Sequence, residues 1–365
     1  MDFTDLFYSQ VQGRDSLLSG LESLLGTEMH TATLMPYGSD FNPEECFKLC
    51  GSNRKVVHMW TREGASLFKL TYYPIKGSRK EHRLEGRFFT YEHPTLPNVF
   101  IIMTIESVDF VRRALIPLLE QNRSHIYLTF IRHQDLHRLL QGFRNIHGYS
   151  DLRVVRTSLI SRFDAEKGET MISSVNWPRL GLEGAFAYAE DQNGWFRSLT
   201  FEVLKESRVV AETTISRNGV VKTDGDLHGV YESLVSPICE LISDNLRLFA
   251  KRSRRDNPLL GVRPLSIEFP KEQFANIEEN ARFIGAIRKL DNASVSVLHG
   301  NPYIALSVID NLDGSTFDLW VLNERELVIV PQMKSSVVGI KRLISGVFDN
   351  YAEGTIKEFS MGIAT

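Results

Sequence analysis

Two histidines four residues apart are the first candidates for chemistry in this chain of 365 residues. His133 and His137 fall on one face of a predicted helix, a spacing that lets two imidazoles reach one metal ion. A zinc protease of this kind needs a glutamate beside the first histidine as its general base, and Gln134 stands there instead. Arginines surround the pair, so we interpret the segment as a solvated basic face rather than a metal or acid–base site.

Asp191, Glu202 and Lys205 come closest to the carboxylates and lysine of a metal-dependent nuclease. Such a site needs an aspartate followed by Glu-x-Lys at the end of a strand, so that the carboxylates hold Mg²⁺ and the lysine positions a water. Two residues separate Glu202 from Lys205, which sends their side chains to opposite faces of a strand. A metal-dependent hydrolase with a dispersed site around Glu202 or His133 is therefore only the third hypothesis for function.

The cysteines give a weaker metal signal. Cys46 and Cys50 lie four apart on a predicted helix with His58 beyond them, but no second close pair completes four zinc ligands. We interpret them as small buried apolar residues, and with Cys239 the total of three does not build a disulfide framework. The chain also lacks the common nucleophile-elbow, P-loop and dinucleotide-binding motifs. We therefore expect a binding protein rather than an enzyme, with no catalytic residue, metal or cofactor.

Arginines give the strongest positive signal. The segment from Lys76 to Arg162 carries fourteen Lys and Arg residues against eight Asp and Glu, inside a chain whose net charge is −3. The planar arginine fork suits phosphate, and nearby aromatic residues could stack on exposed bases. A second basic run follows at residues 251–255. The cations predicted to contact nucleic acid are Arg79, Lys80, Arg83, Arg132, Arg138, Arg144, Arg252, Arg254 and Arg255.

The elements that position these residues are organised around one stretch. Alternating segments at Trp195–Val203 and Val209–Ser216 predict a hairpin, and a helical apolar period over Asp226–Phe249 predicts a long helix. Asp224 or Asp226 can cap its start. Pro237 removes a backbone hydrogen bond inside this helix, so we expect a kink or a break there.

The same order of strands followed by a helix recurs towards both ends of the chain. Near the N-terminus, four predicted strands precede a helix from Ser107 to about Gln121, and its Pro117-Leu-Leu-Glu120 matches Pro237-Ile-Cys-Glu240 at two of four positions. Internal repetition of a meander-plus-helix unit is a hypothesis on this basis. The C-terminal version has predicted strands at Ser294–Leu298, Tyr303–Ile309, Thr316–Leu322 and Leu327–Val330, and a predicted helix over Ser335–Tyr351.

These patterns predict an α+β fold, with mixed or mainly antiparallel sheets covered by helices, in two or three domains. Residues 1–150 form an expected N-terminal domain with the basic patch, 151–257 a central hairpin-plus-long-helix domain, and 258–365 a C-terminal meander-plus-helix domain. Lys251–Pro258 is the clearest linker, because it joins a like-charge run to a proline. The punctuation of Met35-Pro-Tyr-Gly-Ser-Asp predicts a loop.

Composition narrows the classes of function. Hydrophobic residues make up 42% and charged residues 24%, which excludes a wholly disordered chain. The acidic N-terminus and the lack of a long apolar run predict a cytoplasmic protein without a membrane partner. Our first hypothesis is a non-catalytic nucleic-acid-binding or accessory subunit that acts through the arginine patch. The alternative is a protein-interaction or assembly subunit with a protein partner or a second copy of itself.

Overall fold

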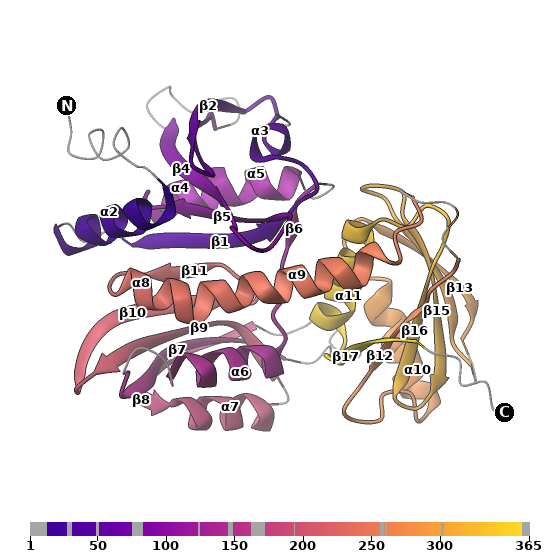
Figure 1. Cartoon of the computed structure of the whole chain (residues 1–365). Helices are drawn as coiled ribbons and strands as arrows, with labels where there is room; N and C mark the ends of the chain where they lie inside the picture. Colours follow the sequence, from indigo (N-terminus) through magenta and orange to yellow (C-terminus); the bar gives the residue numbers. More distant parts are fainter. Residues whose placement is uncertain are drawn as a thin grey trace. The chain divides into compact units, whose positions relative to one another are not determined.

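The computed structural model describes residues 13–27, 31–48, 51–74, 83–122, 125–144, 149–161, 172–192, 194–255, 259, 261–300 and 303–359. The chain forms two compact units (Figure 1). Unit 1 comprises Met1–Leu159, Ser174–Asp191 and Phe196–Ser243, and unit 2 comprises Ile160–Ser173, Gln192–Trp195 and Asp244–Thr365. Helices and two largely antiparallel sheets confirm the predicted α+β fold.

The larger sheet has the strand order β2-β3-β4-β5-β1-β11-β10-β9-β7-β8, with β6 beside β1. Consecutive hairpins build its two flanks, because most neighbours in the sheet are also neighbours along the chain. Its strands are β1 (Ala32–Gly38), β2 (Arg54–Arg62), β3 (Ala65–Tyr72), β4 (Leu84–Glu92), β5 (Val99–Thr104), β6 (Tyr127–Leu128), β7 (Asp151–Ser161), β8 (Ile172–Gly181), β9 (Gly194–Lys205), β10 (Arg208–Ser216) and β11 (Val221–Thr223).

Strand β1 joins the two flanks, and the loop predicted around Met35–Asp40 is wrong for most of its length. β1 pairs with β5 from Thr33 to Gly38 on one side. On the other side it pairs with β11 through residues 32–34 and with β6 through Tyr37 and Gly38. Pro36 lies between these two segments, where its missing N–H interrupts neither ladder. This arrangement accommodates a proline in a central strand.

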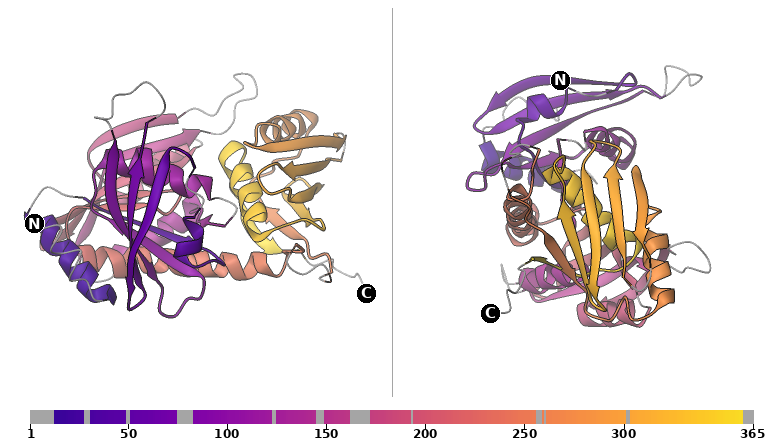
Figure 2. Two further views of the ribbon diagram at one scale, coloured as in Figure 1. Left: turned by 90° about the horizontal axis from the view of Figure 1, so that it is seen from above. Right: turned by 90° about the vertical axis from the view of Figure 1, so that its right-hand side faces the viewer.

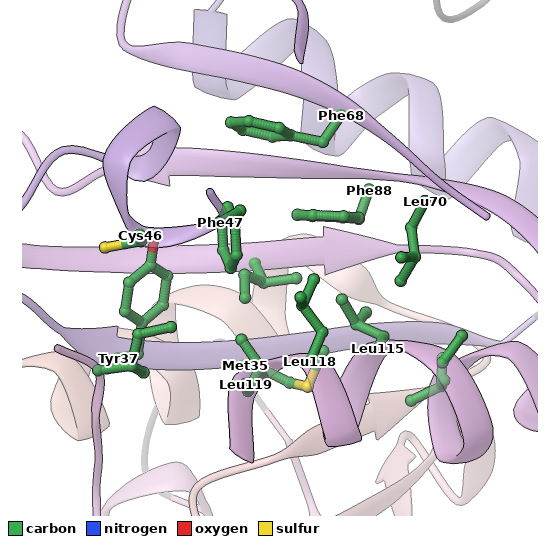
Figure 3. Close-up of a cluster of buried hydrophobic side chains, with 14 of the residues drawn as sticks. Met35, Tyr37, Cys46, Phe47, Phe68, Leu70, Phe88, Leu115, Leu118 and Leu119 are labelled. Atoms are coloured by element: carbon green, nitrogen blue, oxygen red, sulfur yellow. The ribbon is translucent and has the colours of Figure 1, made fainter. Parts of the chain in front are cut away.

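The first core lies between the β1–β5 flank and the helix that follows β5. Phe68, Phe88 and Leu70 from β3 and β4 are fully buried against Leu115 and Leu118 of that helix (Figure 3). Full burial of each such side chain contributes roughly 1.5–3 kcal/mol, so this cluster fixes the helix on the sheet. The helices of this part of the chain are α2 (Gly13–Thr27), α3 (Pro43–Cys46), α4 (Val108–Phe110), α5 (Ile116–Gln121), α6 (His133–Arg144), α7 (Leu182–Asp191), α8 (Leu227–Val230) and α9 (Ser236–Ala250).

The two helices that contain Pro117 and Pro237 each have a π-helical segment just before the proline. A five-residue π-helical segment, Val111–Leu115, separates α4 from α5 and ends two residues before Pro117. An equal segment, Tyr231–Val235, separates α8 from α9 and ends two residues before Pro237. A π-turn widens the helix where proline can donate no hydrogen bond. The predicted kink or break at Pro237 is thus a change of helical pitch. As predicted, Asp226 caps the start of α8, where its carboxylate accepts a hydrogen bond from the Gly229 amide at 2.8 Å.

Unit 2 contains a sheet with the strand order β13-β14-β15-β16-β12-β17. Helix α11 covers one face of this sheet, and the strands lie in front of it in the right-hand view of Figure 2. The ring of Tyr351 lies 5.1 Å from that of Phe283, which ties the end of α11 to α10. The elements are β12 (Leu265–Glu268), α10 (Ile277–Ile287), β13 (Ala293–His299), β14 (Ala305–Asp310), β15 (Thr316–Asn323), β16 (Glu326–Pro331), α11 (Val337–Asn350) and β17 (Thr355–Glu358).

The predicted meander and helix of the C-terminal part are confirmed by β13–β16 and α11, and the predicted hairpin by β9 and β10. The predicted domain boundary at residue 150 falls inside unit 1. In the structure, the two units divide after Ser243, inside α9. No helix among the described residues is both long and apolar enough to cross a membrane.

The contact at Gly225 generates a stability prediction. A Cβ there would lie 2.0 Å from the Val210 carbonyl oxygen, whereas a Cβ at Gly142 in α6 would meet nothing within 4 Å. We expect Gly225→Ala to lower the free energy of unfolding by more than about 2 kcal/mol, and Gly142→Ala to raise it by about 0.5–1 kcal/mol. Urea unfolding of the full chain measures both. Equal stability of the two variants would contradict the close backbone approach at Gly225.

Candidate functional site

The described residues of the predicted basic patch differ in exposure and in their ion-pair partners. Arg79 and Lys80 lie outside the described residues. Arg83 is exposed and forms an ion pair with Glu85 at 3.0 Å, and Lys69 contacts the same carboxylate. The hydrogen bond from Lys69, together with the nearby cations, lowers the pKa of Glu85. This exposed group is therefore partly neutralised, and its energetic value is small.

The three arginines on and beside α6 have different environments. Arg132 holds Asp135 through two hydrogen bonds, Nε to Oδ2 at 2.6 Å and Nη2 to Oδ1 at 2.9 Å. Asp135 is buried, so this bidentate pair serves the start of α6. Arg138 lies 3.7 Å from the same carboxylate, but most of its side chain is exposed. Arg138 and Arg144 are thus the two predicted phosphate contacts on α6 that face solvent.

The second basic run is bound into unit 2. Only 3% of the Arg252 side chain is exposed, and its guanidinium donates to the Leu248 carbonyl at 2.6 Å and pairs with Glu358 at 3.4 Å. The Arg254 amide donates to the Ser335 carbonyl at 3.1 Å. Arg255 donates to the carbonyls of Asp313 and Lys334. These contacts hold the end of α9 on unit 2 and use two of the guanidinium groups that we predicted to bind phosphate.

Asp313 is the centre of this anchoring network. Arg342 Nη2 lies 3.0 Å from Asp313 Oδ2, and the Ser336 hydroxyl donates to the same oxygen at 2.5 Å. Burial by itself raises the pKa of Asp313, but the Ser336 hydroxyl, the Arg342 charge and the Ser315 amide outweigh burial and the net pKa lies below its ordinary value. The carboxylate is therefore charged at neutral pH and acts as a structural clamp.

His133 is an aromatic packing residue in the structure. Its ring lies 4.7 Å from the Phe186 ring and 5.2 Å, stacked, from the Phe196 ring. Burial, aided by the nearby His137 and Arg217, lowers the pKa of His133 to about 4. A general base needs a pKa nearer neutrality, so this imidazole is poorly suited to that role. His137 instead pairs with Glu183 at 3.1 Å on the rim between α6 and α7.

The remaining candidates for metal chemistry that the structure describes come from separate elements. Asp191 ends α7, Glu202 lies opposite Glu212 in the middle of the β9–β10 pair, and Lys205 ends β9. Cys46 is buried with its thiol 3.0 Å from Ser39 Oγ, while Cys50 lies outside the described residues. Within the described part of the chain, no group of three His, Cys, Asp or Glu side chains is placed to hold a metal ion.

The sheet of unit 2 has exposed apolar side chains on the face opposite its helices. Its register places His299, Ala305 and Trp320 side by side on β13, β14 and β15. The neighbouring side chains on these strands, Leu306 and Leu319, are fully buried on the face that the helices cover. Because successive side chains alternate between faces, Trp320 points to the open face. The helix-free side of this sheet therefore carries an aromatic residue.

Four large, exposed apolar side chains lie at this end of the sheet, and we call them the apolar corner. The Val321 amide donates to the Ile304 carbonyl at 3.1 Å, which brings Leu322 beside Tyr303. His299 Nδ1 lies 2.8 Å from the Tyr303 carbonyl oxygen, which joins the end of β13 to Tyr303. The exposed fractions of the corner residues are 65% for Leu298, 71% for Tyr303, 40% for Trp320 and 49% for Leu322.

One feature of the sequence indicates the apolar corner, namely apolar residues at strand positions that face solvent. In β15, Phe317 and Leu319 alternate with Thr316, Asp318 and Trp320, so the outward face begins polar and ends in an aromatic residue. A solvent-facing strand position is normally polar. Trp320 and Leu322 break that rule, and large exposed apolar groups close together mark interaction sites.

Comparison with known proteins gives no family. No family model and no curated protein matches the chain. Among solved structures, the DnaN sliding clamp (DNA polymerase III subunit beta) of Bartonella birtlesii bound to griselimycin was found at 9% identity, covering 86% of this chain and 98% of that chain, with a TM-score of 0.10. A score this low does not indicate a shared fold.

The depressed pKa of His133 makes the stability of the protein depend on pH. His133 binds a proton near pH 6.5 in the unfolded chain but only near pH 4 in the folded chain. Its contribution to the free energy of unfolding is therefore fully present above about pH 7 and is lost as the pH is lowered from 7 towards 4. Between pH 7 and pH 5 the loss due to His133 is about 2 kcal/mol. His133→Phe keeps the ring packing and removes this loss. Urea unfolding of both proteins at the two pH values measures it, and an unchanged pH dependence in the variant would contradict the assignment.

Proposed function

We propose that this protein is a non-catalytic interaction subunit that binds a partner protein through the apolar corner of unit 2. The observation that carries the proposal is the gathering of Leu298, Tyr303, Trp320 and Leu322 on one exposed end of a sheet. Tyrosine and tryptophan are over-represented among residues that dominate binding energy, because they bury a large area with few rotatable bonds.

The chemistry of the corner defines the partner surface it fits. No Asp, Glu, Lys or Arg occurs in residues 293–300, 303–306 or 319–323. The Trp320 indole and the Tyr303 hydroxyl each add one polar group beside apolar area. A partner that supplies an aliphatic or aromatic group and one or two hydrogen-bond acceptors satisfies this surface, whereas a phosphate backbone does not.

Nucleic-acid binding by the predicted arginines stays a separate prediction with weaker support. Arg252 and Arg255 make contacts within unit 2, and Arg132 pairs with a buried aspartate. Arg138 and Arg144 are the cations on α6 that favour it, because both are exposed. Fluorescence anisotropy with short DNA and RNA at low salt tests this prediction, and binding that is lost in the Arg138→Glu, Arg144→Glu variant would support it.

The proposed partner site is tested by photo-crosslinking. A photoreactive amino acid at Tyr303 or Leu322 should give one discrete adduct with a partner in cells that naturally produce the protein. The matched control places the same probe at Met333, which is also an exposed apolar residue of unit 2 but lies outside the corner. We expect no such adduct from the control.

Trp320→Ala should reduce binding of the captured partner at least about tenfold, because a central tryptophan commonly contributes 2 kcal/mol or more. The purified partner and titration calorimetry measure this loss, and circular dichroism checks that the variant is folded. Adducts of equal yield from Met333, or unchanged affinity in Trp320→Ala, would refute the proposed site.

A further inference from the structure

The outer edge of the same sheet is a second surface, which shares only Leu298 with the apolar corner. β13 is the terminal strand, and its central residues Val295, Ser296 and Val297 alternate between the two faces. Val295 and Val297 lie in register with Val308 and Leu306, which are buried under the helices. Yet 36% of Val297 is exposed. The apolar layer of unit 2 therefore continues to the edge of the sheet, where no further strand of the described chain covers it.

Helix α10 extends this uncovered apolar layer. A Cβ at Gly300 would lie 3.5 Å from Ile284 Cδ1 and 3.8 Å from a Cγ of Val297, so both side chains lie beside Gly300, just past the end of β13. Ile277 and Ala281 share the helical stripe of Ile284, and Ile277 is 63% exposed. Exposed or half-exposed apolar side chains thus continue from the edge strand β13 onto the outer stripe of α10.

We propose that this edge pairs antiparallel with β13 of a second copy of the chain. A two-fold axis through Ser296 places Ser296 opposite Ser296 and Val295 opposite Val297, with all four valines on the helix-covered face. The strand is self-complementary about this point, and Ala293–Leu298 contains no charged residue that would oppose its own kind. The two six-stranded sheets then continue as one, and the open backbone groups of both edges are satisfied.

Charge on α10 favours the second copy over an unrelated strand. Exposed Glu278 lies near the beginning of this helix and exposed Arg288 just beyond its end. The two-fold axis sets the two copies of α10 antiparallel on one side of the joined sheet. The acidic beginning of each helix then faces the basic end of the other, so the ends are complementary in charge.

Complementary charges at Ser296 test both the surface and its symmetry. Ser296→Lys and Ser296→Glu each place two like charges opposite each other on the axis, and the exposed position leaves the core untouched. We expect wild-type dimers in sedimentation velocity, at least about tenfold weaker dimerisation in each variant, and recovery of dimers when the two variants are mixed. Thr355→Lys is the matched control, because it adds the same charge to the exposed opposite edge, β17.

Each other outcome overturns the proposal. A wild-type protein that stays monomeric over about a hundredfold range of concentration rules out the dimer. Dimers that persist in both variants place the interface elsewhere. Variants that are monomeric alone and stay monomeric when mixed exclude pairing across a two-fold axis at Ser296. Circular dichroism of each variant shows that it is folded. Failure of this test leaves the apolar corner untested, because the corner residues are unchanged.

Discussion

A strand at the edge of a sheet leaves backbone amides and carbonyls without partners in that sheet, and each edge must be protected or paired. Among the described residues, the two strand orders end in four strands, and three of these show protection. β2 carries Arg54, Lys55 and Arg62 and has a register shift between His58 and Trp60. β8 contains Pro178, and β17 has only four residues, with Lys357 paired to Glu268.

The fourth edge, β13, differs from these three. It has a register shift only between Val297 and His299, at its last residues, and it contains neither proline nor a charged residue apart from His299. The same strand contains exposed Leu298 and lies near exposed Tyr303 and Trp320. The edge at β13 is thus apolar where the other three carry charge, proline or few residues. The proposed interaction function and the proposed dimer both start from this contrast.

Much of the architecture could be predicted from local patterns. The alternation in β9, β10 and β13–β16 and the helical periods of α9 and α11 are strong because each strand or helix buries one face. The part of the fold that could not be predicted depends on pairing between residues far apart in the chain. β1 was predicted as a loop because proline and glycine mark turns locally, and only its pairing with β11 and β6 explains Pro36.

The role of a charged residue was equally hard to predict. A run such as Lys251-Arg-Ser-Arg-Arg suggests a free basic surface. In the structure, Arg252 pairs with Glu358, and Arg255 donates to the carbonyls of Asp313 and Lys334. These partners lie 58 to 106 residues further along the chain. Partners at that distance are set by the fold and cannot be read from spacing. The apolar corner lies between these cases, because Trp320 already breaks the polar pattern expected on an open strand face.

The most direct measurement of the central claim is amide hydrogen exchange followed by mass spectrometry at low and high protein concentration. If β13 is an assembly edge, peptides that cover Ala293–His299 exchange more slowly as the concentration is raised, while peptides from the protected edge β2 exchange at the same rate. Exchange in β13 that does not change with concentration, or slowing that is equal in β2, would contradict the account.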